Sequence, residues 1–407
     1  MNAPLARPRR LPLVERTAEP AHAPARAPVP VPVPPGARAW LGLVGEIGRG
    51  YLRALAPDAA RRTPFAVSFL VTARCPLRCQ HCFYHYATSS PETELTVDEY
   101  DALGQSLGPF PVALFCGGEP YLRPDLGELV LRVRRHAGAP LAATTTNGQL
   151  TDSIVTQTEA ILRAEPRRPF TVGFSLDGPR EVHDAIRGRG TFERALATYR
   201  ECQRLARHYP CLSLTATTVV QALNHAAAAG FVRWAARELR PTAHAVLLAR
   251  QSPRGGEGVK KVPLASYAAA QEAAVETMRA GSPWKRLRPD ALYLEAVARH
   301  VTTTRATGRR SFHCLAGTHG ALVDPVGQVQ VCEQLAEQPG VGYLGNLREH
   351  GMDFGALWQS AEAARARALV NHHATCRDCT HETMGHATSL LFPPNRLLCG
   401  PRPGGAA

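Results

Sequence analysis

Residues 72–83 read TARCPLRCQHCF and place Cys75, Cys79 and Cys82 in the spacing C-x3-C-x2-C. Cysteine thiolates are the usual ligands of iron–sulfur clusters, and a saturated [4Fe–4S] cluster takes four of them. Three thiolates from one loop therefore predict a cluster whose last iron is open to a ligand that is not protein. A zinc site is the alternative, although structural zinc sites favour paired C-x2-C halves that close all four positions.

The cysteine motif resembles the signature of the radical S-adenosylmethionine (SAM) superfamily, and later motifs match in order over about residues 65–400. In that family the open iron is chelated by the amino and carboxylate groups of SAM. An electron from the cluster then cleaves SAM to a 5′-deoxyadenosyl radical, which abstracts hydrogen from a substrate. The resemblance implies a [4Fe–4S] cluster bound with SAM, which supplies the difficult chemistry. It also implies an electron donor of the flavodoxin or ferredoxin type.

The bulk composition limits the class of partner. The chain has 407 residues, enough for one large domain and a smaller one. Its formal net charge of +13 would suit an acidic partner. Nearly all of that charge is arginine dispersed among prolines and alanines, and no stretch interleaves basic and aromatic residues as single-strand binders do. The composition therefore argues against nucleic acid as a partner.

Targeting signals are not recognisable in the sequence. The start MNAPLARPRR lacks the apolar run of a secretory signal, and no later segment offers 18 uncharged apolar residues. We therefore expect a cytoplasmic protein with no membrane partner. Its 11 cysteines would then be reduced ligands and thiols rather than a disulfide framework.

The organisation along the chain changes character several times. Residues 1–37 are rich in Ala, Pro and Arg and should form an extended or disordered tail. Apolar side chains at three- and four-residue steps predict a helix within residues 38–62. Apolar runs then alternate with segments of helical spacing. The expected strands cover residues 65–72, 112–116, 141–146, 170–176, 212–219 and 243–248.

Repeated strand–helix units imply parallel strands joined by right-handed crossovers. Periodicity alone does not separate an open sheet from a barrel. The resemblance implies an α/β fold, a partial (β/α)6 TIM-like barrel over residues 63–250, with active residues at the carboxyl ends of the strands. Residues 251–309 would form a helical linker. Residues 310–400 would form a small C-terminal auxiliary-cluster domain, with a tail over 401–407.

The second expected strand ends at Gly117-Gly118-Glu119-Pro120. Two glycines allow the backbone to approach a ligand closely, and the glutamate adds a carboxylate. By itself the motif could equally be a tight turn. After the cysteine motif it resembles the family's SAM-binding turn, which implies that Gly117, Gly118 and Glu119 contact SAM.

The next two strands end in further polar segments. The third ends at Thr-Thr-Asn-Gly, which includes Asn147 and resembles the family's T-N-G segment beside the nucleoside, although Asn-Gly also favours a plain turn. The fourth ends at Ser-Leu-Asp-Gly, which includes Ser175 and Asp177, and Arg187 follows. The resemblance implies that Ser175 and Asp177 lie near polar groups of SAM. It also implies that Arg187 pairs with the carboxylate of SAM.

A second cysteine group lies near the C-terminus, in the spacing C-x12-G-x4-C followed by C-x2-C. Its members are Cys314, Cys332, Cys376 and Cys379. The spacing resembles the auxiliary-cluster modules called SPASM and Twitch. The larger SPASM version needs two further cysteines after the C-x2-C pair, and residues 380–386 supply none. The resemblance therefore implies one auxiliary [4Fe–4S] cluster with four protein ligands, with a zinc site as the alternative.

Glu333 follows Cys332 directly, after an expected hairpin of residues 321–323 and 329–331. In sulfatase-maturing relatives an acidic residue at this position takes a proton from the substrate. Glu333 is therefore the predicted catalytic general base, with an exposed glutamate of no function as the alternative.

The resemblance implies a radical SAM oxidoreductase or maturase that oxidises a peptide side chain or a small natural-product intermediate. The auxiliary cluster favours oxidation, because it gives the second electron a place to go. A redox-neutral epimerase with Cys399 as hydrogen donor is one alternative. A non-catalytic iron–sulfur protein that transfers electrons or senses redox state is another. Fold analogy does not choose the substrate.

Overall fold

The protein is described here by a computed structural model that covers residues 45, 63–280, 289–338 and 340–382. The tail expected over residues 1–37 lies outside the described residues, and so does the helix expected within residues 38–62, apart from residue 45. Cys399 and the C-terminal tail lie outside them as well.

Parallel strands form the centre of the fold. They are β1 (Ala66–Thr72), β2 (Phe110–Gly117), β3 (Gly138–Thr146), β4 (Phe170–Ser175), β5 (Leu212–Val220) and β6 (His244–Leu248). Each strand pairs in parallel with the next, so their order in space follows their order in the chain. Strand β1 is buried along its whole length, as expected for a parallel strand covered on both faces.

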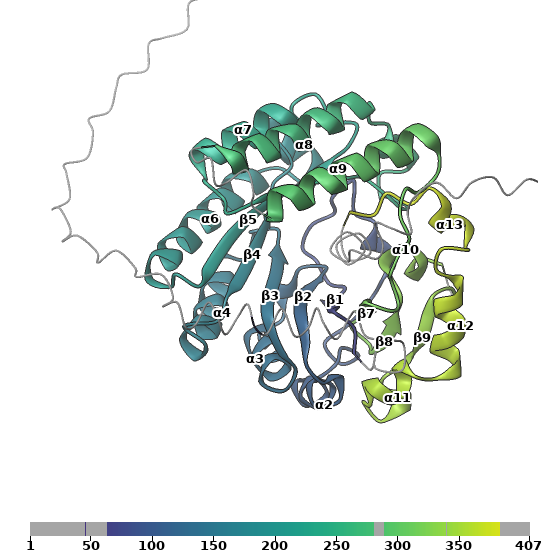
Figure 1. Ribbon diagram of the computed structural model, residues 1–407. Coiled ribbons are helices and arrows are strands. Elements are labelled where there is room, and N and C mark those ends of the chain that lie inside the picture. The colour runs from purple at the N-terminus through teal and green to yellow at the C-terminus, as the bar shows by residue number, and fades with distance from the viewer. Residues whose placement is uncertain (1–44, 46–62, 281–288, 339, 383–407) are drawn as a thin grey trace, which may run out of the picture. The chain divides into compact units, whose positions relative to one another are not determined.

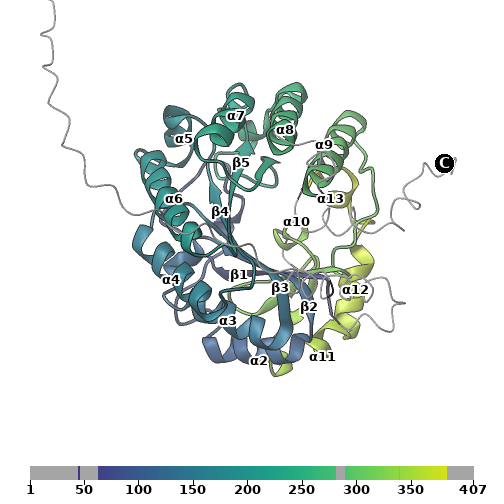
Figure 2. The same ribbon diagram turned by 60° about the vertical axis from the view of Figure 1, so that its left-hand side comes forward.

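Helices follow the strands and cover the outer face of the sheet (Figures 1 and 2). They are α2 (Val97–Leu107), α3 (Leu126–Ala137), α4 (Thr151–Ala164), α5 (Arg180–Arg187), α6 (Thr191–His208) and α7 (Ala228–Glu238). Leu126, Leu129, Val130 and Val133 of α3 are fully buried, because their helical spacing puts them on one face. The predicted partial (β/α)6 barrel is confirmed.

The C-terminal part of the chain continues the same sheet, which the sequence did not predict. Strand β7 (Gly320–Val323) pairs in parallel with β1, and β8 (Gln328–Gln330) and β9 (Tyr343–Asn346) follow in antiparallel pairs. The order β6-β5-β4-β3-β2-β1-β7-β8-β9 makes one nine-stranded sheet. The expected hairpin is therefore present, and its first strand extends the barrel sheet.

Shorter helices surround β7–β9. They are α10 (Glu333–Ala336), α11 (Phe354–Trp358), α12 (Ala361–Leu369) and α13 (Ala374–Arg377). One apolar core runs from the barrel strands into this region, because Phe115, Val323 and Phe354 belong to the same buried cluster. A second buried cluster joins β6 to α8 (Leu264–Arg279) and α9 (Pro289–Thr307). Among the helices that the structure describes, none has the length and apolar character to cross a membrane.

Candidate active site

The cysteine loop leaves β1 at Thr72 and is fixed at its start by the buried Glu94. Thr72 Oγ1 donates to one Glu94 oxygen at 2.5 Å. Arg74 donates to both oxygens, from Nε at 3.0 Å and from Nη2 at 2.8 Å. A carboxylate that accepts two hydrogen bonds from one arginine, in a bidentate contact, has a defined orientation. The segment that leads into Cys75 is thus held in place by the protein's own hydrogen bonds.

The Gly-Gly-Glu-Pro turn at the end of β2 packs directly on this loop. Gly118 N donates to Thr72 O at 2.7 Å, and Glu119 N donates to Arg74 O at 2.8 Å. A Cβ on Gly117 would lie 2.3 Å from Thr72 O, and one on Gly118 would lie 2.2 Å from Arg74 O. Both glycines are required because the two backbones approach too closely for a side chain.

Glu119 joins the ends of two strands from a buried position. Its carboxylate accepts hydrogen bonds from Thr146 Oγ1 at 2.8 Å and from Asn147 N at 2.7 Å. Burial raises the pKa of Glu119 to about 7, although these hydrogen bonds act to lower it. Both glycines line the cavity described below, whereas Glu119 is not among its lining residues.

Two side-chain donors point at the cysteine sulfurs. Asn147 Nδ2 lies 3.7 Å from Cys75 Sγ, and Arg187 Nη1 lies 3.7 Å from Cys79 Sγ. Arg187 Nε also donates to the buried Asp177 at 2.6 Å. Burial acts to raise the pKa of Asp177, but the Arg187 guanidinium, the nearby His81 and His183 and the hydrogen bond from Val219 N together outweigh it, and the pKa lies at about 2. The pair is therefore ionised.

A cavity of about 730 Å³ opens at the carboxyl ends of the strands. It is lined by the three loop cysteines and by Gly117, Gly118, Asn147, Ser175 and Arg187. A volume of this size suits a small-molecule cofactor. Three thiols facing a cavity, two donors aimed at their sulfurs and a turn without side chains fit an iron–sulfur cluster with a bound small molecule. Asp177 is not among the lining residues and lies behind Arg187.

The second cysteine group comes together from separate segments. Cys314 precedes β7, Cys332 follows β8, and Cys376 and Cys379 lie in and just after α13. Burial raises the pKa of Cys332 well above its usual value, and the nearby Cys314, Cys379 and Cys376 raise it further. Burial likewise raises the pKa of Cys379 to about 12. Thiols that influence one another's pKa in this way fit a metal cluster, whose positive charge would stabilise their thiolates.

Neither group is arranged around a single ion. In residues 63–280, 289–338 and 340–382, no three or more His, Cys, Asp or Glu side chains are grouped as the ligands of one metal ion would be. Cysteines that hold an iron–sulfur cluster bind different iron atoms, so their sulfurs need not converge on one point.

Glu333 lies on the wall of the same cavity as the loop cysteines. Its carboxylate is 2.8 Å from Arg250 Nη2 and 3.0 Å from His381 Nε2. Burial acts to raise the pKa of Glu333, but His381 and Arg250 outweigh it and the pKa lies at about 2. The residue after Cys332 and the three loop cysteines thus line the same cavity.

Sequence reasoning missed the partners of Glu333. Arg250 follows β6, where a polar residue at a strand end could have drawn attention. His381 and Glu382 follow the last cysteine pair without any motif. Glu382 accepts a hydrogen bond from Leu248 N at 2.7 Å and lies 3.4 Å from Arg250 Nη1. The stretch that ends at Glu382 therefore binds to the edge strand β6.

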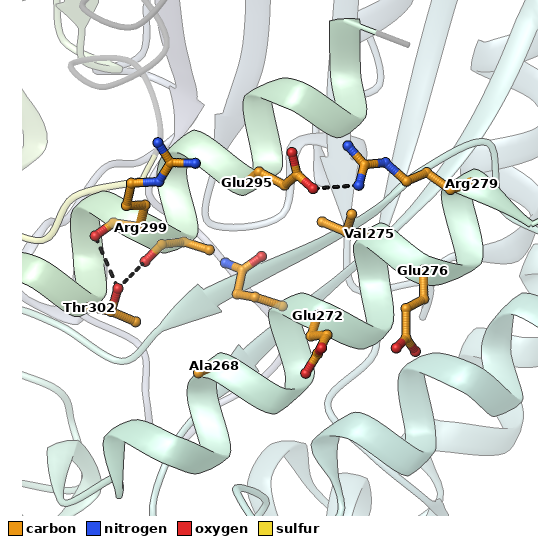
Figure 3. A pocket seen from close by; sticks show the side chains of 10 residues that line it. Ala268, Glu272, Val275, Glu276, Arg279, Glu295, Arg299 and Thr302 are labelled. Carbon is orange, nitrogen blue, oxygen red and sulfur yellow. Dashed lines mark hydrogen bonds and ion pairs between the residues drawn. The ribbon is translucent and has the colours of Figure 1, made fainter. Parts of the chain in front are cut away.

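A second cavity of about 500 Å³ lies between α8 and α9 (Figure 3). Glu272, Glu276 and Arg299 line it, and Arg279 and Glu295 form an ion pair at 2.5 Å. It contains no cysteine and none of the predicted site residues. We therefore place the chemistry in the larger cavity.

Comparisons with known proteins agree with this site. The family model described as Radical SAM superfamily matches residues 69–231, and SPASM, described as an iron–sulfur cluster-binding domain, matches residues 314–380. Fe-coproporphyrin III synthase of Methanosarcina barkeri is 39% identical, and the match covers 33% of this chain and 32% of that protein. The match therefore spans about a third of that relative.

Longer matches are less identical. AdoMet-dependent heme synthase of M. barkeri is 29% identical over 75% of this chain and 85% of its own length. Mycofactocin maturase MftC of Mycobacterium ulcerans is 27% identical over 84% of this chain and 87% of its own length. The solved structure of Streptococcus suis SuiB superposes with a TM-score of 0.53 at 12% identity, covering 81% of this chain and 72% of SuiB, and shows the shared fold.

The two matched domains account for the two cysteine groups. Their cofactors are a [4Fe–4S] cluster that binds SAM and an auxiliary iron–sulfur centre. The chain therefore carries a domain of the radical SAM superfamily over residues 69–231 and a SPASM-type iron–sulfur domain over residues 314–380.

Proposed function

We propose that this protein is a maturase that uses radical SAM chemistry to oxidise a side chain of a peptide or of a small natural-product intermediate. One observation carries the proposal: the single cavity of about 730 Å³ is lined both by the loop cysteines and by Glu333, the neighbour of Cys332. A substrate in this cavity would have the SAM site on one side and the auxiliary domain on the other.

The loop cysteines Cys75, Cys79 and Cys82 would hold the SAM-binding cluster. When bound, the cluster and SAM supply a 5′-deoxyadenosyl radical that removes a hydrogen atom from the substrate. Gly117, Gly118, Asn147 and Ser175 would line the SAM pocket, because all of them border the cavity. Glu119 would support Asn147 from behind, and Asp177 would support Arg187, through the hydrogen bonds described above.

Cys314, Cys332, Cys376 and Cys379 would hold the auxiliary cluster, which favours net oxidation because it can accept an electron. Glu333 would accept the substrate proton. Its pKa of about 2 keeps it ionised at neutral pH and also makes it a weak base. A substrate that separates Glu333 from Arg250 or His381 would strengthen the base. We place the reaction in the cytoplasm, with reduced thiols and a flavodoxin- or ferredoxin-type electron donor.

A peptide is the substrate class that we favour. The relatives divide between proteins named for heme synthesis and a maturase, and SuiB has been solved bound to its precursor peptide SuiA. The cavity has to hold SAM and the reacting group together, and its volume suits a side chain better than a whole macrocycle.

The test is the release of 5′-deoxyadenosine by anaerobically reconstituted enzyme with dithionite and SAM. Wild-type protein should release it, and Cys79→Ala should not. Cys211→Ala is the matched control, because Cys211 is half-buried and does not line the cavity. Equal release by Cys79→Ala and wild type would refute the proposal. Cluster-loaded wild-type protein that releases none would be an electron-transfer protein instead.

The oxidative outcome has a separate readout. Once a substrate is found, turnover in deuterated water should leave no solvent deuterium at the reacting carbon. Solvent deuterium at that carbon would identify a redox-neutral epimerase.

A further inference from the structure

Every nitrogen of the Arg187 guanidinium already has a partner within the protein. Nε donates to Asp177 at 2.6 Å, Nη1 donates to Cys79 Sγ at 3.7 Å, and Nη2 lies 3.4 Å from His81 Nε2. The residue is only 8% exposed. Its charge is therefore directed at the cysteine loop, although family resemblance alone would direct it at the SAM carboxylate.

Asp177 holds Arg187 in this direction. The Asp177 side chain is fully buried, and its other oxygen accepts a hydrogen bond from Val219 N at 2.9 Å. Its backbone carbonyl accepts another from Asn224 Nδ2 at 2.8 Å. The carboxylate is thus fixed between β4, β5 and Arg187. Turning the guanidinium away would leave a buried carboxylate without its cation, which is strongly unfavourable.

We propose that Arg187 tunes the SAM-binding cluster by donating to the Cys79 thiolate, with Asp177 as its positioning residue, and that it is not the ligand of the SAM carboxylate. The inference rests on the proposed function only in taking Cys79 as a cluster ligand. A buried cation beside a ligand sulfur favours the reduced cluster, which carries one more negative charge. Asn147 donates to the Cys75 sulfur from an uncharged amide, so it should also favour the reduced cluster, but more weakly than Arg187 does.

The test is a redox titration of cluster-loaded protein, followed by electron paramagnetic resonance. The signal to follow is the one that changes when SAM is added. At a fixed applied potential, Arg187→Gln should shift the ratio of reduced to oxidised cluster roughly tenfold toward the oxidised form. This corresponds to a midpoint potential lower by about 59 mV for a one-electron couple. Arg187→Lys should recover most of this shift because it keeps the charge.

Two further variants separate electrostatics from damage to the fold. Asp177→Asn removes a negative charge but keeps an oxygen that can accept the hydrogen bond from Arg187 Nε, so Arg187 stays beside Cys79 and the cluster potential should rise. General loosening of the fold does not predict such a rise. Arg254→Gln removes a positive charge from the same cavity lining, but its side chain is exposed and screened. It should shift the potential by less than half as much as Arg187→Gln.

SAM affinity, measured by anaerobic calorimetry, distinguishes the two roles of Arg187. For Arg187→Gln we expect a dissociation constant within about twofold of wild type, since no carboxylate contact is lost. An unchanged midpoint potential in Arg187→Gln would overturn the inference. If that variant also bound SAM about tenfold more weakly, Arg187 would instead be the partner of the SAM carboxylate. Wild-type protein that binds no iron would instead refute the proposed function.

Discussion

Replacing Gly118 with alanine tests how the cysteine loop is held on the end of β2. The added Cβ would lie 2.2 Å from Arg74 O and 2.8 Å from Ala73 O, and both are backbone atoms that cannot rotate away. Relief requires the loop to move, which breaks the bonds from Gly118 N to Thr72 O and from Glu119 N to Arg74 O. Overpacking costs about 1–3 kcal/mol, and each lost hydrogen bond about 1 kcal/mol. The total is about 4 kcal/mol.

The assay compares thermal unfolding and iron content of Gly118→Ala with those of wild type. A loss of about 4 kcal/mol predicts a fall in Tm of roughly 8–16 °C for a domain of this size. We also expect less bound iron, because Cys75 moves with the loop. Gly230→Ala is the matched control: a Cβ there meets nothing within 4 Å, and alanine stabilises helix α7 by about 1 kcal/mol. A Gly118→Ala protein with wild-type Tm and iron content would refute the steric account.

Three other changes probe the supports of the site. Glu94→Gln loses the charged pair with Arg74, and should cost about 2 kcal/mol in denaturant unfolding and lower the iron content; unchanged iron would show that this anchor is dispensable. Arg250→Gln removes one of the cations beside the buried Glu333 carboxylate and should lower the free energy of unfolding by about 3 kcal/mol. The loss is read from a lower Tm, and a variant as stable as wild type would contradict the ion-pair geometry. The folded pKa of Asp177, about 2, lies below its usual 3.8, so its stabilisation is complete above about pH 4 and is lost as the pH falls toward 2. The free energy of unfolding of Asp177→Asn should therefore fall by about 2 kcal/mol less than that of wild type between about pH 4 and pH 2. Identical pH dependence of unfolding in the two proteins would contradict this expectation.

The barrel could be predicted because its signals are local. The expected strand over residues 212–219 is observed as Leu212–Val220, and the expected strand over 243–248 as His244–Leu248. Apolar runs of strand length alternate with helical spacing, and such patterns need no knowledge of distant contacts. The positions of the cysteine loop and of the turn at Gly117 follow from the same strand ends.

The remaining features depend on contacts between distant residues. The pairing of β7 with β1 joins Gly320 to Ala66, and the contact of Arg250 with Glu382 spans more than a hundred positions. No spacing rule connects such positions. The partner of the Arg187 guanidinium could not be predicted from the sequence either. Whether it points at the SAM carboxylate or at the Cys79 sulfur depends on where Asp177 is buried.

The central claim is that the cluster held by Cys75, Cys79 and Cys82 keeps one iron open for SAM. The most direct measurement is electron–nuclear double resonance on reduced protein with SAM labelled with ¹⁵N at its amino group. We expect hyperfine coupling between that nitrogen and the cluster in wild-type protein, and its loss in Cys79→Ala. A cluster that forms fully in wild-type protein but shows no coupling to the label would contradict it.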